Sequence, residues 1–314
     1  MSFLAHFAVL LALLRFVPAL CGQTVLHTAR LEVVHGKPYI MVMVNGQGPF
    51  RFVIDTGTGG SAMVAPELAD RLELPSAGVA RLTDPSGKGD RREHLVLIDS
   101  IEIAGVEFSG VKAVRHALPD EDGSCLGLLG FPLFHDYLLS LDYLRRRMTL
   151  SLGTLEPDGK RSVLPFRMPN GVPIVPLLVG NVQFEAQFDS GGTGLSLPEQ
   201  LVNQLKLSSG PVLFGIGQSL ATRYQVKAAR LADDVHLGRY AFSRPVVEIN
   251  PAFPIANFGS RPLENFAVTF DQKSLLMRLD SPRDSFRLDI APTTIRMENA
   301  PPQRPVDLAL VPVG

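Results

Sequence analysis

The sequence predicts an all-β protein with a few short helices, folded into two similar β-barrel lobes. The first observation is that Pro (25) and Gly (28) are spread along the 314 residues, which favours many short strands and turns over long helices. The second is that two stretches repeat one another in order and spacing, each with an opening hairpin that ends on an aspartate. Because 46% of the residues are apolar, each lobe can bury a core of its own.

The charges exclude one class of partner. Thirty basic residues balance thirty-one acidic ones, and they are not gathered into the basic patch that nucleic-acid binding needs. The run Arg145-Arg146-Arg147 is interpreted as a solvated strand edge or turn. The seven histidines show no metal-ligand spacing, so we expect neither a metal nor a cofactor.

Residues 1–22 predict a signal peptide. Residues 3–20 are strongly apolar apart from Arg15, yet the run is short for a membrane span. It ends in Ala19-Leu20-Cys21, a pattern that suits signal cleavage, and the mature chain is expected to begin near Gly22. We therefore expect an exported protein, periplasmic or secreted, without stable membrane insertion. An uncleaved N-terminal anchor is the alternative.

The chain has two cysteines, Cys21 and Cys125. Cleavage after Cys21 leaves Cys125 alone, so no internal disulfide is expected. No histidine lies near Cys125 in the sequence, and a lone cysteine is more often buried and inert than catalytic.

The internal repeat begins with two hairpins that end in Asp55 and Asp189, 134 residues apart. Residues 39–46 and 49–55 form the first, and residues 175–181 and 182–189 form the second. The spacing persists downstream, first at 134 and then at 129 residues. The paired landmarks are Ile101 with Val235, Phe108 with Phe242, Gly130 with Gly259, Asp142 with Asp271 and Met148 with Met277. An internal duplication explains this register.

The repeat sets the expected domain boundaries. Residues 23–155 form the N-terminal lobe, 156–171 a linker, 172–282 the C-terminal lobe and 283–314 a Pro-rich, partly disordered tail. Each aspartate is followed by a short helix candidate that opens on Pro-Glu, at residues 66–72 and 198–205. Each lobe is expected to close with an apolar segment and a last strand.

Two carboxylates brought together across a pseudo-twofold axis can share one proton, because both cannot ionise side by side. One then acts as an acid and the other as a base toward a water and a carbonyl group. Gly57 and Gly191 allow tight turns beside the pair. The hydroxyls of Thr56 and Ser190 can bond across the lobe interface. Asp55 and Asp189 are therefore the predicted catalytic residues.

The two motifs, Asp55-Thr56-Gly57-Thr58 and Asp189-Ser190-Gly191, resemble the paired Asp-Thr/Ser-Gly motifs of the pepsin and retropepsin aspartic proteases. Leu128-Leu129-Gly130 resembles the apolar-apolar-Gly element of that family. The resemblance covers roughly residues 35–282, and the short loops are closer to exported bacterial retropepsin-like proteins than to digestive pepsins. It implies an aspartic endopeptidase with a cleft between the lobes and a peptide or protein substrate. A single chain with both motifs is expected to act as a monomer.

The sequence departs from that family at two places. Position +3 is Thr58 in the first motif but Gly192 in the second, so the second aspartate lacks a supporting hydroxyl. The resemblance also implies a mobile hairpin flap that covers the cleft, and neither candidate for this flap carries the tyrosine typical of pepsins. The flap candidates are Gly87 and Gly89 in the first lobe and Gly215 and Gly217 in the second, and either hairpin can be the one that closes.

Three alternatives are weighed against proteolysis, and the weakest is a structural β-sandwich protein, which would not need Asp-x-Gly at matching points. Residues 57–62 formally fit a dinucleotide-binding turn, but the strand–helix alternation of such a domain is absent. The more serious alternative is a catalytically silent peptide-binding module on the same fold, since Gly192 weakens the second motif and fold does not guarantee chemistry. Two retained aspartates favour the enzyme.

Overall fold

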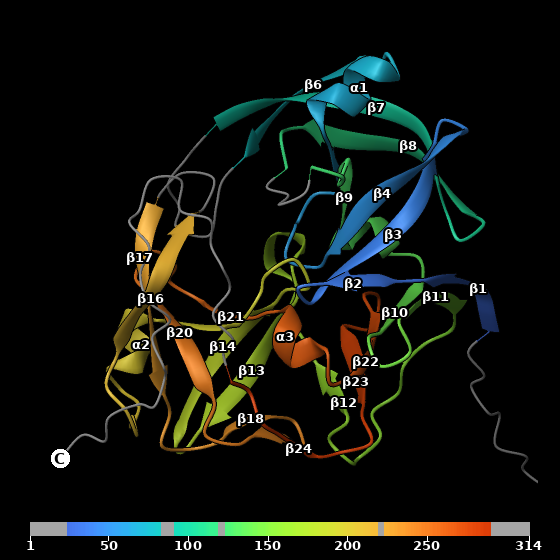
Figure 1. Ribbon diagram of the computed structural model, residues 1–314. Helices are drawn as coiled ribbons and strands as arrows, with labels where there is room; N and C mark the ends of the chain where they lie inside the picture. The colour runs from blue at the N-terminus through green and yellow to red at the C-terminus, as the bar shows by residue number, and fades with distance from the viewer. Residues whose placement is uncertain (1–23, 83–90, 119–122, 219–222, 290–314) are drawn as a thin grey trace, which may run out of the picture.

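The structure is a computed structural model of the whole chain, and it describes residues 24–82, 91–118, 123–218 and 223–289. The described part is mainly β, as predicted, with strands that form three sheets (Figure 1). Two of these sheets define what we call the first and second lobes. The third sheet takes strands from both halves of the chain.

The first lobe is built on an eight-stranded sheet. In spatial order its strands are β2 (Glu32–Val34), β3 (Lys37–Val44), β4 (Gln47–Asp55), β9 (Gly127–Gly130), β5 (Ala62–Val64), β8 (Val106–Arg115), β7 (Arg91–Ile103) and β6 (Ser76–Leu82). Strands β3 and β4 form the predicted opening hairpin, whose turn at Asn45-Gly46 has the positive φ that Asn and Gly tolerate. Strand β4 ends on Asp55, as predicted.

The second lobe is built on a ten-stranded sheet. In spatial order its strands are β16 (Val212–Gln218), β17 (Arg223–Arg230), β20 (Val246–Asn250), β15 (Leu195–Pro198), β21 (Ala256–Phe258), β14 (Val182–Phe188), β13 (Ile174–Val179), β18 (Val235–Leu237), β19 (Tyr240–Phe242) and β24 (Ser285–Phe286). The run β14-β21-β15-β20-β17-β16 has the same sequence of parallel and antiparallel pairings as β4-β9-β5-β8-β7-β6 in the first lobe.

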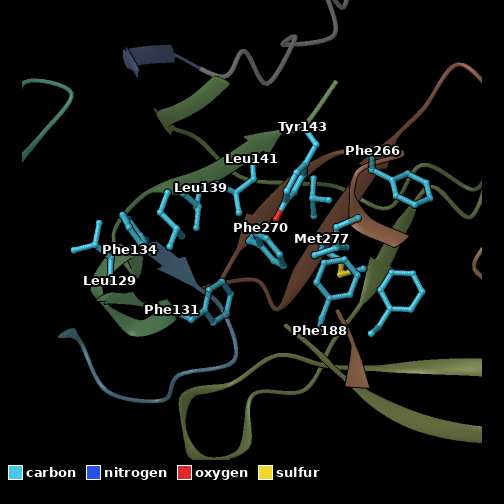
Figure 2. Packing of buried hydrophobic residues seen from close by; sticks show 14 of the residues in the cluster. Leu129, Phe131, Phe134, Leu139, Leu141, Tyr143, Phe188, Phe266, Phe270 and Met277 are labelled. Carbon is cyan, nitrogen blue, oxygen red and sulfur yellow. The ribbon is translucent and has the colours of Figure 1, made fainter. Parts of the chain in front are cut away.

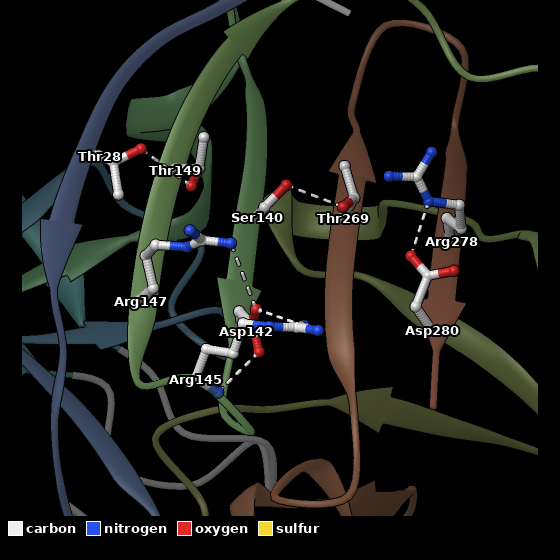
Figure 3. Close-up of polar contacts among 9 residues, drawn as sticks. All are labelled: Thr28, Ser140, Asp142, Arg145, Arg147, Thr149, Thr269, Arg278 and Asp280. Atoms are coloured by element: carbon white, nitrogen blue, oxygen red, sulfur yellow. Dashed lines mark hydrogen bonds and ion pairs between the residues drawn. The ribbon is translucent and has the colours of Figure 1, made fainter. Parts of the chain in front are cut away.

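The third sheet joins the two lobes. In spatial order its six strands are β1 (Thr24–Arg30), β11 (Arg147–Leu152), β10 (Leu138–Asp142), β22 (Ala267–Asp271), β23 (Leu276–Asp280) and β12 (Val163–Pro165). The expected last strands are present as β11 and β23, and because the strands before them, β10 and β22, pair with each other, the closing strands of the two lobes form one sheet. At the centre the hydroxyls of Ser140 and Thr269 lie 2.8 Å apart (Figure 3). These two residues are themselves 129 positions apart, the spacing of the later landmarks in the repeat.

Helices are few and short. The two predicted helices are present as α1 (Pro66–Arg71) and α2 (Glu199–Val202), each with a glutamate in its first turn, where the helix dipole favours a negative charge. Helix α3 (Ser260–Leu263) and the 3₁₀ turns η1 (Phe131–Phe134) and η2 (Pro169–Gly171) complete the set. Among the described residues, no helix has the length and apolar character needed to cross a membrane.

One apolar core runs beneath both lobes. Phe270 on the third sheet packs against Phe131 of the first lobe and Phe188 of the second, with ring centroids 5.0 and 5.6 Å apart (Figure 2). All three rings are 1% exposed or less. Because Phe188 immediately precedes Asp189, this core fixes the strand end that carries the second aspartate.

The structure revises two expected boundaries. Residues 285–289 belong to the second lobe, because β24 pairs with β19 and Phe286 and Leu288 are buried, so this lobe extends beyond residue 282. The expected linker contains β12, which pairs with β23. The signal-peptide interpretation and the remaining tail, residues 290–314, fall outside the described residues.

Candidate active site

Asp55 and Asp189 lie against each other where the two lobes meet. Asp55 follows the buried Ile54, Asp189 follows the buried Phe188, and both aspartates are partly buried. A methyl group placed on Gly57 would overlap the Asp189 carboxyl, and one on Gly191 would overlap the Asp55 carboxyl. The glycine of each motif thus touches the carboxyl of the other, and only glycine permits this approach.

Thr56 and Ser190 lock the two aspartate loops together through four reciprocal hydrogen bonds. Thr56 Oγ1 donates to the Phe188 carbonyl (2.7 Å) and accepts from the Ser190 amide (3.0 Å). Ser190 Oγ donates to the Ile54 carbonyl (2.7 Å) and accepts from the Thr56 amide (3.0 Å). Both residues are fully buried. The interaction between the two loops is therefore nearly symmetric, and it fixes the relative position of the carboxyls.

Asp55 is held by its own motif. The Gly57 amide donates to Oδ1 (2.8 Å) and the Thr58 hydroxyl donates to Oδ2 (2.9 Å). Burial, followed by the neighbouring charge of Asp189, raises the pKa of the Asp55 carboxyl to about 7, against the opposing effect of the Thr58 hydrogen bond. Burial and the neighbouring Asp189 charge therefore both favour the protonated form of Asp55.

Asp189 has three donors, despite the absent hydroxyl at Gly192. The amides of Gly191 (2.9 Å) and Gly192 (2.8 Å) both donate to Oδ1. The side-chain amide of Asn257 on β21 donates to Oδ2 at 2.6 Å. A side chain at position 192 would place its Cβ 2.6 Å from Asp189 Oδ2 and 2.9 Å from Asn257 Nδ2. Asn257 thus occupies the place that Thr58 takes in the first motif.

Asn257 and Gln187 are site residues that the sequence reasoning missed. Gln187 Nε2 donates to the Gly57 carbonyl across the interface, at 2.9 Å. Pairing along the strands aligns Asn257 with Leu128 and Gln187 with Val53 of the first lobe. The repeat spacings of 129 and 134 residues align the same pairs in the sequence. A polar residue in one repeat opposite an apolar residue in the other is therefore the signal that could have found both.

The closing glycines of the two lobes support the aspartate loops from below. A side chain at Gly130 would overlap the Gly60 carbonyl, and one at Gly259 would lie 2.6 Å from the Gly194 carbonyl. Gly130 also pairs with Asp55 in the parallel ladder of β4 and β9. The glycine of the apolar-apolar-Gly element in the first lobe is therefore required, because the backbone of the aspartate loop packs directly against it.

The flap candidates of the second lobe belong to the hairpin β16–β17, and those of the first lobe lie between β6 and β7 in the sequence. Gly215 and Gly217 lie within β16, whereas Gly87 and Gly89 lie outside the described residues. Cys125 is buried, and no cluster of potential metal ligands occurs among the residues that the structure describes.

Comparison with known proteins identifies part of this arrangement. Residues 40–133 match the family model described as aspartyl protease. The match covers the Asp55 motif and the Leu128-Leu129-Gly130 element, and it ends before the second motif. No curated protein matches the chain.

Proposed function

We propose that the protein is an aspartic endopeptidase in which Asp55 and Asp189 form the catalytic dyad, and the match of residues 40–133 to the aspartyl protease family model supports this proposal. The observation that carries this proposal is the mutual packing of each motif glycine on the other motif's carboxyl. Two carboxyls in such contact titrate as one unit, which supplies an acid and a base at the same place.

The hydrogen bonds favour different roles for the two carboxyls. Asp55, whose pKa is raised to about 7 by burial and by the Asp189 charge, carries the shared proton. Asp189 faces three donors, and such donors stabilise the ionised form of a carboxyl. We therefore assign Asp55 as the acid and Asp189 as the base of the first step.

In that step Asp189 takes a proton from a water molecule while the water oxygen bonds to the carbonyl carbon of the substrate. Asp55 gives its proton to the carbonyl oxygen, and a tetrahedral diol results. In the second step Asp189 passes its proton to the peptide nitrogen as the carbon–nitrogen bond breaks. Asp55 recovers a proton from the diol hydroxyl, so both carboxyls return to their starting states.

The substrate we propose is an extended, mostly apolar peptide segment. An extended backbone can pair with the edge of a hairpin, as peptides do when they add a strand to a sheet. Val79 on β6 and Leu213 and Ile216 on β16 are exposed apolar side chains on the two candidate hairpins. These residues supply apolar contacts of the kind that such a segment would make.

Peptide-library cleavage across roughly pH 3–8 tests the dyad. We expect the wild type to cut and the variants Asp55→Asn and Asp189→Asn to lose at least about 10³-fold in kcat, because each change removes half of one acid–base unit. Circular dichroism should show that both variants keep the fold. Equal cutting by all three proteins would identify a contaminant. Binding of peptides without cutting at any pH would instead favour the silent peptide-binding module.

We also propose that the protein acts outside the cytoplasm, after removal of residues 1–22. The apolar run at residues 3–20 and the Ala19-Leu20-Cys21 sequence motivate this. N-terminal sequencing of protein from the exported fraction should give a start near Gly22. An intact Met1 in a cytoplasmic fraction would contradict export, and an intact Met1 in a membrane fraction would favour the N-terminal anchor.

A further inference from the structure

A row of polar side chains crosses the second sheet on the face that carries Asp189. Strand pairing places Gln187 beside Asn257, Asn257 beside Ser196 and Ser196 beside Glu248, on the successive strands β14, β21, β15 and β20. Directly paired residues project from the same face of a sheet, so these four form one line. We call them the polar row.

The polar row faces the dyad rather than the core. Its first member, Gln187, bonds the Gly57 carbonyl, and its second, Asn257, bonds Asp189. The residues next along the strands, Phe188, Phe258 and Leu197, point the other way and are fully buried. Glu248 lies two strands from Asn257, which corresponds to about 10 Å.

The first lobe holds the same line of positions with apolar residues. Its row is Val53, Leu128, Met63 and Val114, joined by the equivalent pairings. Val53 and Leu128 are buried there in a small cluster with Tyr39 and Cys125. The fold itself therefore does not demand polar side chains at these positions, and their presence in the second lobe needs another explanation.

The row contains hydrogen-bond acceptors that have no partner within residues 24–82, 91–118, 123–218 and 223–289. Among the residues described, none forms a hydrogen bond or ion pair with the carboxyl of Glu248, which is only partly exposed. Asn257 Oδ1 is buried and likewise without a hydrogen-bond partner within the described part of the chain. Leaving such groups unpaired is costly, and most are satisfied by a protein group or an ordered water, whose place a ligand can take.

Gly194 sets the carboxyl of Glu248 directly against the loop that carries Asp189. A side chain at position 194 would overlap Glu248 Oε1, so the backbone of the loop packs on this carboxyl. Burial raises the pKa of the Glu248 carboxyl, and the charge of Arg261 acts in the opposite direction. A positive group from a ligand would stabilise the ionised carboxyl and so offset the energetic cost of burying it.

We propose that the polar row is a substrate subsite that accepts a basic side chain, Lys or Arg, close to the scissile bond. The inference rests on the proposed peptidase function. An ammonium or guanidinium group offers only donors, which suits the partly exposed carboxyl of Glu248. The remainder of the cleaved segment stays apolar, so the preference concerns one position of an extended peptide.

The test uses matched peptides in which Lys, norleucine or Glu is walked through each position that flanks the cut. We expect wild type to favour the Lys peptide at one position by at least about tenfold in kcat/KM, as for a charge-assisted hydrogen bond in a partly buried site. Glu248→Gln should remove this preference and Glu248→Lys should reverse it toward the Glu peptide. Glu199→Gln removes an exposed carboxylate that pairs with Lys227, and should leave the preference unchanged.

Failure of the subsite and failure of the enzyme give different results. If wild type cuts the peptides with the same Lys-to-norleucine ratio as Glu248→Gln at every position, the subsite is overturned and the peptidase stands. If wild type cuts none of them, the peptidase fails, and calorimetric binding of the same peptides to wild type and Glu248→Gln decides the subsite. Equal affinities for the Lys and norleucine peptides in both proteins would overturn it.

Discussion

The side-chain amide of Asn257 donates a 2.6 Å hydrogen bond to Asp189 Oδ2, the position at which Asp55 accepts from the hydroxyl of Thr58. The two lobes thus support their aspartates by different chemical groups from different elements. Asn257 comes from β21, whereas Thr58 comes from the motif itself. The absence of a side chain at Gly192 leaves room for the Asn257 amide, so the support of Asp189 by Asn257 depends on glycine at position 192.

We predict that Asn257→Leu, which copies Leu128, lowers kcat/KM by about 10- to 100-fold, the effect of one lost hydrogen bond to a charged group. The ionised form of the pair loses a donor, so the acidic limb of the pH–rate profile should move to higher pH. The measurement is kcat/KM against pH for the variant and wild type. An unchanged profile would show that Asn257 does not support Asp189.

A double variant tests the coupling between Gly192 and Asn257. Gly192→Thr alone should be harmful, because its Cβ would lie 2.6 Å from Asp189 Oδ2 and 2.9 Å from Asn257 Nδ2. Combined with Asn257→Leu, the threonine gains space and reproduces the first-lobe arrangement. We expect the double variant to be more active than Gly192→Thr alone. Simple addition of the two losses in a double-mutant cycle would contradict the coupling.

The Thr56–Ser190 contact predicts a large loss of stability on removal of either hydroxyl. Thr56→Val and Ser190→Ala each delete two buried hydrogen bonds and leave partners unsatisfied, so each should lower the free energy of unfolding by about 2–4 kcal/mol. Urea unfolding measures this, with Ser109→Ala as the control, since Ser109 is exposed. Midpoints equal to that of the control would contradict the role of the contact.

The raised pKa of Asp55 predicts how stability depends on pH. The unfolded chain releases this proton near pH 3.8, whereas the folded chain holds it to about 7. Between these values the folded state binds more protons, so the contribution of Asp55 to stability falls as pH rises. Asp55→Asn should therefore be more stable than wild type above neutrality, by roughly 2–4 kcal/mol, with a smaller difference near pH 4.

Urea unfolding of both proteins at a series of pH values checks this prediction. The other ionisable groups are common to the two proteins, so the difference between their curves isolates Asp55 and its coupling to Asp189. A difference that does not vary with pH would show that Asp55 titrates near its ordinary value in the folded chain.

Sequence reasoning reached the parts of the fold that depend on local pattern. The strand that ends on Asp55 and the strand that ends just before Asp189 are marked by apolar runs and turn residues, and the helices after them by Pro-Glu. The third sheet was missed because pairing of β10 with β22 joins segments more than 120 residues apart, and periodicity does not specify a distant partner. The support of Asp189 by Asn257 was missed for the same reason, because the two residues are 68 positions apart and Asn257 lies outside the Asp-Ser-Gly motif.

Two buried tyrosines give the last prediction. Tyr143 Oη is buried and has no hydrogen-bond partner among the residues described, while Tyr240 Oη donates to the Leu279 carbonyl at 2.7 Å. An unsatisfied buried hydroxyl lowers stability by about 1–3 kcal/mol, so Tyr143→Phe should be neutral or stabilising. Tyr240→Phe should lower the free energy of unfolding by about 1 kcal/mol or more, because it leaves the Leu279 carbonyl without that donor. Both side chains are close to fully buried, so ring packing is matched and urea unfolding compares only the hydroxyls. Burial, and then the charge of Asp189, raises the pKa of the Tyr143 hydroxyl, which lies near Ser190. A larger loss of stability for Tyr143→Phe than for Tyr240→Phe would show that the Tyr143 hydroxyl has a hydrogen-bond partner there.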